Sequence, residues 1–445
     1  MSSERNPVDI SPLLDGGEWG RYQRFVVALG AMALIFDGVD IQVLGVAVPT
    51  LMKDWALPRS AFVPVIAIGL VGMALGSVLI GMVGDRWGRR RALIGSITVL
   101  GVFTALASQA HDIHTLEMLR FLAGFGLGGA LPNASALAAE YVPLRHRPFA
   151  VTLTIVCIPL GSSVAGIVAA HVLPVHGWRV LFLAGGAAAV GVALVLGWLL
   201  PESPRFMARD TRRWQELTAI LARIGRPVAI GAQFVDSGEQ TVKRASLGAL
   251  LTREYVRDTL LLWCAFFSCL LAIYMGFNLL PAMLTNAGLD ISVASRGIAA
   301  FNLGGVAGAI GAALIIQRVG SKSTMVIISI LGIAGALVLR SMHLDAVSVV
   351  TVIGMLALTG GAINAVQTAM YALAAHVYPT AVRATGVGAA STIGRCGAIA
   401  SAYVGNAAIE WGGSATFFLA MATTVTVTTV ALLLMRRHIA AGDRI

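Results

Sequence analysis

The stretch GMVGDRWGRRRAL, residues 81–93, is a short basic loop between two long apolar runs. Its glycines permit a tight turn, and Asp85 is placed to cap the next helix or to pair with a neighbouring basic residue. Arginine-rich loops of this kind stay on the cytoplasmic side of a membrane. The stretch therefore predicts two membrane spans that are joined by a cytoplasmic turn.

The composition of the whole chain agrees with a membrane protein. Of its 445 residues, 57% are hydrophobic and only 12% are charged, and the mean hydropathy is +0.82. These values exclude an ordinary soluble domain. The net charge of +10 resides in short loops between apolar runs, which predicts membrane topology and no binding to nucleic acid.

Twelve apolar runs are each long enough to cross a bilayer, which takes about 20 residues. A polar linker at 201–258 separates two six-helix bundles at 25–200 and 259–436, and cytoplasmic tails are expected at 1–24 and 437–445. The first tail has acids and prolines and no apolar core, so we do not expect it to be a cleavable signal peptide. The spans are expected to begin near Phe25, Ala61, Arg91, Thr115, Pro148, Trp178, Thr259, Ala294, Thr324, Ala346, Val382 and Ser414.

The two halves resemble each other at equivalent loops. AAEYVPLRHR at 138–147 aligns with AAHVYPTAVR at 374–383, and GDRWGRRRAL at 84–93 aligns with IQRVGSKSTM at 316–325. Gln317 stands where the first copy has Asp85, so a charged latch is expected in the first copy only. The sequence predicts an all-α polytopic membrane protein with twelve transmembrane helices in two pseudo-symmetric halves. Such a duplication places the substrate site near the midplane, between the halves.

The distribution of basic residues predicts the orientation. With the N-terminus inside, 25 of the lysines and arginines lie on the cytoplasmic side, five lie outside and two lie within spans. Both termini are therefore expected in the cytoplasm. The linker carries many of these charges, with a short amphipathic helix expected at 214–224, and it is predicted to touch anionic membrane lipid.

Three charged residues lie inside predicted spans of the first half. Asp37 and Asp40 are three residues apart in IFDGVDIQVLG, residues 35–45, and Arg120 lies in the fourth span. A buried arginine costs about 2.5–3.5 kcal/mol on insertion scales and needs an internal partner. Positions i and i+3 share a helix face, so we expect Arg120 to serve both carboxylates. Asp37 and Asp40 are the predicted proton-coupling pair.

Four motifs together resemble a known family: DGVD (37–40), RFLAGFGLGGALPNASALAAEY (120–141), LPESPRF (200–206) and RATGVGAASTIGRCGA (383–398). With the loop at 81–93, the twelve spans and the repeat, the chain resembles the major facilitator superfamily and, within it, the aromatic acid:proton symporter family. LLWCAFFSCLLAIYMGFNLLPAML (261–284) and VYPTAVRATGVG (377–388) look most like its 3-(3-hydroxyphenyl)propionate transporter branch. Muconate and hydroxybenzoate carriers are near relatives of that branch.

The resemblance implies inward transport of an aromatic carboxylate with protons across the plasma (inner) membrane. In the superfamily the signature loop is a conformational latch, and the resemblance marks residues near the cytoplasmic helix ends for gating or capping. The predicted gating residues are Asp85, Arg86, Arg89, Glu140 and Arg383.

Arg395 is the leading candidate for binding the substrate carboxylate. It lies about thirteen residues into the eleventh span, which is roughly 20 Å from the cytoplasmic end. A guanidinium binds a carboxylate through a bidentate fork. Pro159 occupies the aligned place in the first half, so the repeat does not require a cation there. The alternative role is a structural ion pair with another span.

Other polar residues within spans are candidates for the cavity wall, and each has bridging between helices as its alternative role. With Arg395 and Arg120, the predicted substrate-binding residues are Gln42, Tyr274, Asn278, Asn364, Gln367 and Tyr371. Tyr274, Phe277 and Tyr371 are the expected aromatic walls. The histidines and cysteines show no metal-ligand or catalytic spacing, and no ATP-binding loop is present, so we expect no cofactor, no metal and no enzymatic activity.

These patterns favour a proton-coupled importer of an aromatic carboxylate that works as a monomer by alternating access. One alternative is a proton-coupled exporter of drugs or metabolites on the same fold. The predicted midplane position of Arg395 argues against a cationic cargo for such an exporter. A second is a membrane sensor that binds an aromatic acid without moving it.

Overall fold

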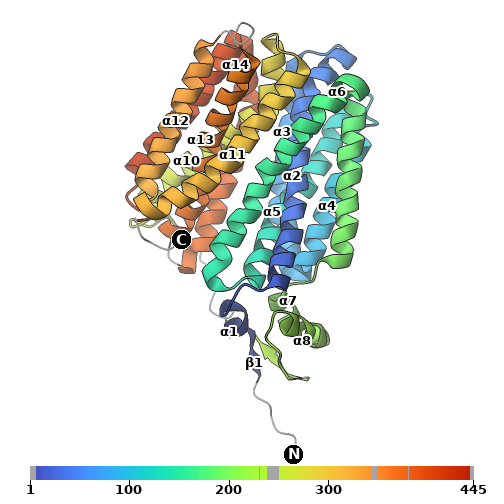
Figure 1. Ribbon diagram of the computed structural model, residues 1–445, viewed down its shortest axis with the longest axis vertical. Coiled ribbons are helices and arrows are strands. Elements are labelled where there is room, and N and C mark those ends of the chain that lie inside the picture. Colours follow the sequence, from blue (N-terminus) through green and yellow to red (C-terminus); the bar gives the residue numbers. More distant parts are fainter. Residues whose placement is uncertain (1–6, 230, 238–249, 343–347, 379, 441–445) are drawn as a thin grey trace, which may run out of the picture.

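The computed structural model describes residues 7–229, 231–237, 250–342, 348–378 and 380–440, apart from the side chains at 148, 317 and 380–384. Helices dominate this part of the chain (Figure 1). The first half contains α2 (Arg21–Trp55), α3 (Val63–Trp87), α4 (Arg89–Ala107), α5 (Ile113–Tyr141) and α6 (Arg147–Leu199). The second half contains α10 (Val256–Asn286), α11 (Ile291–Val319), α12 (Ser321–Ser341), α13 (Val349–Val377) and α14 (Thr380–Leu434).

Two of these ten helices are long enough to cross a membrane twice, and both are broken at glycine. In α6 the break is at Gly177, with φ 72°, and in α14 it is at Gly412 and Gly413, with φ 61° at Gly413. Glycine adopts positive φ without the steric cost that a Cβ imposes. The described helices thus give twelve spans, as predicted, and the sixth and twelfth follow these breaks at Trp178 and Ser414.

The same packing pattern occurs in both halves. In the first half α2 packs on α6 and α3 on α5, and in the second half α10 packs on α14 and α11 on α13. The glycines of 124–129 allow close packing in the first half, because a Cβ at Gly124 would lie only 2.1 Å from the carbonyl oxygen of Gly69. The glycine-rich stretch GFGLGG at 124–129 is therefore a helix-packing feature of α5.

The most extensive contacts between the two halves are α6 with α11, α2 with α10, and α3 with α14. We call the end of the bundle that holds the start of α2 and the end of α14 the terminal face, and the opposite end the far face (bottom and top of Figure 1). Near the middle of α2, Gln42 donates to the carbonyl oxygen of Phe277 at 3.2 Å and accepts from Asn302 at 3.1 Å. Closer to the far face, Arg59 donates to Asn406 at 2.9 Å.

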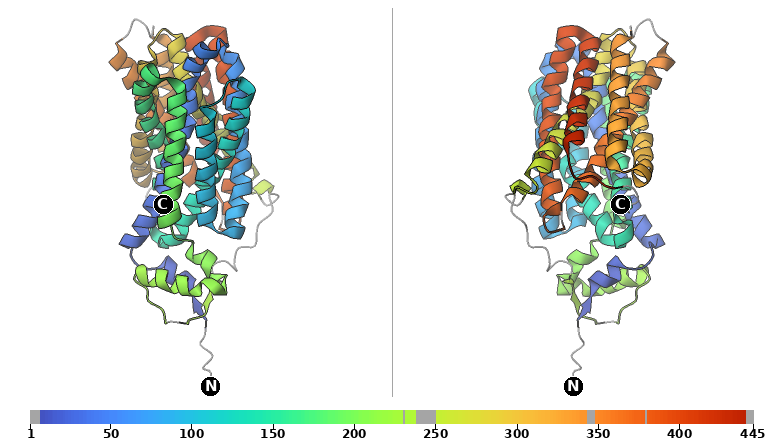
Figure 2. Two further views of the ribbon diagram at one scale, coloured as in Figure 1. Left: turned by 90° about the vertical axis from the view of Figure 1, so that its right-hand side faces the viewer. Right: turned by 90° about the vertical axis from the view of Figure 1, so that its left-hand side faces the viewer.

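A small unit lies below the terminal face in the two side views of Figure 2. It consists of α1 (Ile10–Asp15), α7 (Pro204–Ala208), η3 (Thr211–Arg213), α8 (Trp214–Arg223), and the parallel strands β1 (Val8–Asp9) and β2 (Phe234–Val235). The helix expected at 214–224 is α8. The strand pair was not predicted, and α2 begins at Arg21, four residues before the expected start of the first span.

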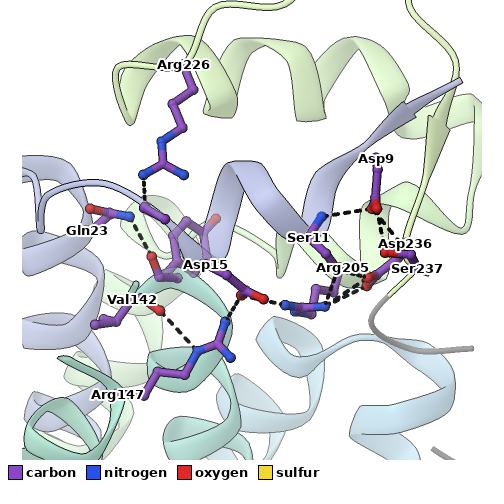
Figure 3. Close-up of polar contacts among 12 residues, drawn as sticks. Asp9, Ser11, Asp15, Gln23, Val142, Arg147, Arg205, Arg226, Asp236 and Ser237 are labelled. Atoms are coloured by element: carbon purple, nitrogen blue, oxygen red, sulfur yellow. Dashed lines mark hydrogen bonds and ion pairs between the residues drawn. The ribbon is translucent and has the colours of Figure 1, made fainter. Parts of the chain in front are cut away.

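Figure 3 shows how ion pairs attach this unit to the bundle. Arg205 donates to Asp15 at 2.9 Å and to Asp236 at 2.9 Å, and Asp15 also pairs with Arg147 at the start of α6. The N-terminal segment and the linker, which are distant in sequence, are thus held together on the first half.

Candidate functional site

Asp40 and Arg120 form a buried ion pair between α2 and α5. Arg120 donates to both carboxylate oxygens of Asp40, at 3.0 Å and 2.8 Å, and the two residues are 5% and 3% exposed. Thr104 of α4 donates a hydrogen bond to the same carboxylate. Paired bonds in this fork geometry are the arrangement that makes a buried arginine tolerable in lipid. The expected Asp40–Arg120 contact is present and joins three helices of the first half.

Asp37 does not share this arginine, although it is only one helical turn away. Its side chain is 4% exposed, and its Oδ1 atom has no hydrogen-bond partner among the described residues. Asp37 lines a cavity of about 70 Å³ in the middle of the bundle, whereas Asp40 lines a separate and much smaller one. The expectation that Arg120 serves both carboxylates is therefore wrong, because the two side chains lie against different neighbours of α2.

Arg395 of α14 lines the same central cavity as Asp37, across the interface between the halves. It forms no ion pair with any described residue, and its Nη1 atom approaches the carbonyl oxygen of Met73 at 3.5 Å. The cavity thus holds one carboxylate and one guanidinium that face it without pairing. This arrangement leaves the guanidinium fork available for a carboxylate ligand.

The other walls of the central cavity are mixed in character. Asn364, Gln367, Thr368 and Tyr371 line it from one face of α13, and Tyr274 and Phe277 line it from α10. Tyr274 and Phe277 contact each other edge to face, with ring centroids 5.6 Å apart, and Tyr371 contacts Phe266 in the same way at 5.1 Å. The cavity therefore offers hydrogen-bonding groups and aromatic walls in addition to the two charges.

Three predicted substrate-binding residues lie outside the central cavity. Gln42 is fully engaged in the bridge between the halves. Asn278 and Arg120 line a different small cavity beside α3. For Gln42 and Arg120 the helix-bridging alternative describes the observed contacts better, whereas the Nδ2 atom of Asn278 has no hydrogen-bond partner in the described chain.

Several residues on the cavity or its supports had no role assigned from sequence, among them Pro159, Met73 and Thr104. Pro159 and Met73 line the central cavity, and Thr104 supports Asp40. For Pro159 a signal existed, because it aligns with Arg395 in the repeat, and the two equivalent positions face one cavity. Thr104 carries no comparable signal in the sequence.

The signature loop forms a charged cluster at the terminal face. Gly88 has φ 107° and makes the turn between α3 and α4. Arg89 pairs with Asp85 one turn away and with Glu140 of α5 at 3.5 Å, and Arg86 is exposed without an ion pair in the described chain. Arg383 is in α14, but its side chain lies outside the described residues.

Glu202, from the LPESPRF motif, joins this loop to the linker. It is 1% exposed and accepts hydrogen bonds from the backbone N–H groups of Arg90 and Ser203, each at 3.0 Å. The carboxylate thereby satisfies an N–H group in the first turn of α4, where no intrahelical partner exists. The linker is thus fixed to the first half by a helix-capping contact.

The family model of the Major Facilitator Superfamily matches residues 30–402 and, in a second match, residues 262–443. The chain belongs to this superfamily. A Gallate transporter of Pseudomonas putida is 35% identical over 91% of this chain and 90% of its own length. The 4-hydroxybenzoate transporter PcaK of Acinetobacter baylyi is 32% identical over 94% of this chain and 92% of its own.

A 3-(3-hydroxy-phenyl)propionate transporter of Escherichia coli K12 is 30% identical, over 84% of this chain and 85% of its own length. The major facilitator chain is a transporter and not an enzyme, and the predicted relationship to aromatic acid transporters is confirmed. Among solved structures, an inward-facing bacterial homolog of the human lysosomal transporter Spinster has the same fold. Its TM-score is 0.68 with 16% identity, over 94% of this chain and 97% of that chain.

Proposed function

We propose that this major facilitator chain imports an aromatic carboxylate together with protons across the plasma (inner) membrane. The observation that carries the proposal is the central cavity, where Arg395 and Asp37 face the same space without pairing and aromatic rings form part of the wall. Relatives that transport gallate, 4-hydroxybenzoate and 3-(3-hydroxy-phenyl)propionate support an aromatic acid as the substrate class.

In this mechanism Arg395 binds the substrate carboxylate and Asp37 carries the proton. An ionised Asp37 in the same cavity repels an incoming carboxylate, and the repulsion is strong where the local dielectric constant is low. Protonation removes that charge, so proton binding promotes substrate binding in the same conformation. Tyr274, Asn364, Gln367 and Tyr371 position the rest of the molecule.

Asp40 has a different role in the proposal. Its bidentate pair with Arg120 and its bond from Thr104 hold α2, α5 and α4 together, so that the first half moves as one body. The bundles at 25–200 and 259–436 then rock about the central cavity, and a monomer is sufficient because the cavity is built within one chain. The cluster of Asp85, Arg89 and Glu140, together with Arg86 and Arg383, acts as the gate.

The terminal face is assigned to the cytoplasm, with both termini and the linker on that side. The support is the excess of lysine and arginine in the loops of this face. The basic linker is then placed to contact anionic membrane lipid.

The test is uptake of radiolabelled 4-hydroxybenzoate and 3-hydroxyphenylpropionate into proteoliposomes under an imposed pH gradient. The wild-type protein is expected to accumulate at least one of them when the outside is acidic. Asp37→Asn is expected to lose accumulation but to retain exchange of external for internal substrate, because a neutral side chain permits binding without a proton.

Asp112→Asn is the matched control, since Asp112 is an exposed helix cap at the far face and lies outside the central cavity. Accumulation by Asp37→Asn equal to that of the wild type would refute the proton assignment. Efflux driven by the same gradient would indicate the exporter, and binding without uptake would indicate the sensor.

A further inference from the structure

A second and larger hollow lies at the far face, where the two halves meet. Its volume is about 530 Å³, against about 70 Å³ for the central cavity. The end of α2 and the segment before α3 line it from the first half, with Leu173 of α6, and the end of α10 and the start of α11 line it from the second half. Its size is within the range of small-molecule sites in proteins, which is about 300–1,000 Å³.

The basic groups of this hollow have unused hydrogen-bonding capacity. Lys53 forms no ion pair or hydrogen bond with a described residue, and its charge acts on Asp290 of the same hollow. Arg59 uses its Nε atom to donate to Asn406 at 2.9 Å, and its two terminal nitrogens have no partner in the described chain. Asn406 in turn donates to Glu410 at 2.9 Å, and the charge of Glu410 also acts on Arg59. The two terminal nitrogens of Arg59 and the ammonium group of Lys53 are therefore available to bind an anion.

The acid in the hollow, Asp290, is engaged by its own helix. It accepts hydrogen bonds from the hydroxyl of Ser292 at 2.8 Å and from its backbone N–H at 3.3 Å, and so caps α11. These bonds, the hydroxyl first, hold the pKa of Asp290 below its ordinary value. Asp290 offsets one positive charge, and the lining of the hollow keeps a net positive charge because Lys53 and Arg59 outnumber its one acid; Glu410 acts on Arg59 from outside this lining.

Apolar side chains complete the lining, among them Leu57, Leu173 and Ile291. A cationic group beside an apolar wall matches a ligand with an anionic head and an apolar body. A small inorganic anion would leave the apolar wall uncovered, and a cation would be repelled by Lys53 and Arg59.

We propose that the far-face hollow is an encounter site for aromatic carboxylates, separate from the central cavity. The carboxylate binds at Lys53 and at the free edge of Arg59, and the ring rests on Leu57, Leu173 and Ile291. This role rests on the proposed function, since it places the site on the side from which the substrate arrives. The contact from Arg59 Nε to Asn406 remains intact when the free edge is occupied, so the ligand binds beside a closed interface. The site raises the local substrate concentration before the halves rearrange.

The first test measures initial uptake of radiolabelled 4-hydroxybenzoate at low and high ionic strength. Charged clefts at the entrance to a binding site change substrate association rates by about 10-fold or more, and salt screens this effect. Lys53→Glu is expected to raise KM about tenfold with kcat unchanged, and to flatten the salt dependence. Lys53→Gln is expected to have a smaller effect in the same direction, and Arg59→Lys, which retains the charge, a smaller one still.

Arg340→Gln is the matched control, because Arg340 is also an exposed cation at the far end of its helix but lies outside the hollow. Wild-type kinetics and wild-type salt dependence in Lys53→Glu would overturn the encounter site. Equal effects of Lys53→Gln and Arg340→Gln would also overturn it, since they would indicate a general surface potential.

A second measurement does not depend on uptake. Ligand-detected NMR on the purified Arg395→Gln protein is expected to show residual weak binding of benzoate but not of acetate, and Lys53→Glu added to that variant should abolish it. Binding of benzoate that survives the double change, or no residual binding in Arg395→Gln, would refute the site. Absence of proton-driven uptake in the wild type would refute the proposed function. The NMR result would still decide whether the far-face hollow binds an aromatic carboxylate.

Discussion

The two halves of the molecule make the same turn at the signature loop and then stabilise it differently. Gly88 and Gly320 are equivalent in the repeat, and both have positive φ, 107° and 88°. In the first half, Arg89, Asp85, Glu140 and Glu202 surround the turn with charges. In the second half, Ser321 exchanges hydrogen bonds with Ile439, both at 2.9 Å, and no charged pair replaces them among the described residues.

The interiors of the two halves also differ in their charged contacts. The first half contains the closed pair of Asp40 and Arg120, and the second half contributes a single cation, Arg395, to the central cavity. The duplication has thus kept the backbone geometry, while the charged contacts are specific to each half. Losing one partner of a closed buried pair destabilises a fold, whereas an unpaired charge facing a cavity is available for a ligand.

The largest expected effect comes from breaking the closed pair in the first half. Asp40→Asn leaves the Arg120 guanidinium buried without its counter-charge, and removing one partner of a buried pair costs about 3–5 kcal/mol. Thermal unfolding in detergent measures it. Asp37→Asn is the control one turn away and is expected to keep the wild-type unfolding temperature, because Asp37 has no such partner. Equal destabilisation by the two changes would contradict the separation of their roles.

The unpaired cation of the second half is expected to affect binding and to leave stability unchanged. Arg395→Gln should weaken binding of an aromatic carboxylate about 100-fold, equivalent to about 2.7 kcal/mol. Arg395→Lys should restore only part of this, since an ammonium lacks the fork. Equilibrium binding and unfolding temperature, measured on the same samples, check both statements. A large loss of stability in Arg395→Gln would instead indicate a structural ion pair.

A smaller effect is expected at the charged loop. Glu202→Ala removes the acceptor for the Arg90 N–H in the first turn of α4, and losing a helix-terminal acceptor costs about 0.5–2 kcal/mol. Glu216→Ala is the control, because its pair with Arg213 is on the surface and such pairs contribute about 0–1 kcal/mol. Hydrogen exchange of the α4 N-terminus, resolved by mass spectrometry, should rise in Glu202→Ala only.

The smallest effect is expected at the equivalent turn of the second half and depends on pH. The His438 ring lies beside the Ser321 hydroxyl, at 3.3 Å, and burial lowers its pKa below the ordinary 6.5. The folded state therefore prefers the neutral ring: the stabilisation is complete above pH 6.5 and is lost as the pH falls through the lowered pKa. Hydrogen exchange at 320–325 should increase at acidic pH in the wild type. His438→Gln should remove that pH dependence, and an unchanged profile would contradict the assignment.

Much of the fold was predictable because membrane spans are long apolar segments whose ends are marked by charge and glycine. The breaks at Gly177 and Gly413 precede the predicted starts at Trp178 and Ser414. The pair of β1 and β2 was not predictable, since each strand has only two residues and its partner lies far away in the sequence. Periodicity carries no signal over two residues.

The sequence by itself determined the twelve spans, the duplication, the need for a partner to Arg120, and the place of Arg395 deep within a span. Only the tertiary structure decided which carboxylate is the partner. Asp37 and Asp40 are one turn apart on α2 and point in slightly different directions around its axis. Asp40 therefore faces α5, whereas Asp37 faces the central cavity between the halves. The role of a side chain depends on the element that it faces, and the packing of segments distant in sequence decides which element that is. The far-face hollow also belongs to the tertiary structure, because its two cations acquire a shared apolar wall only when the halves meet.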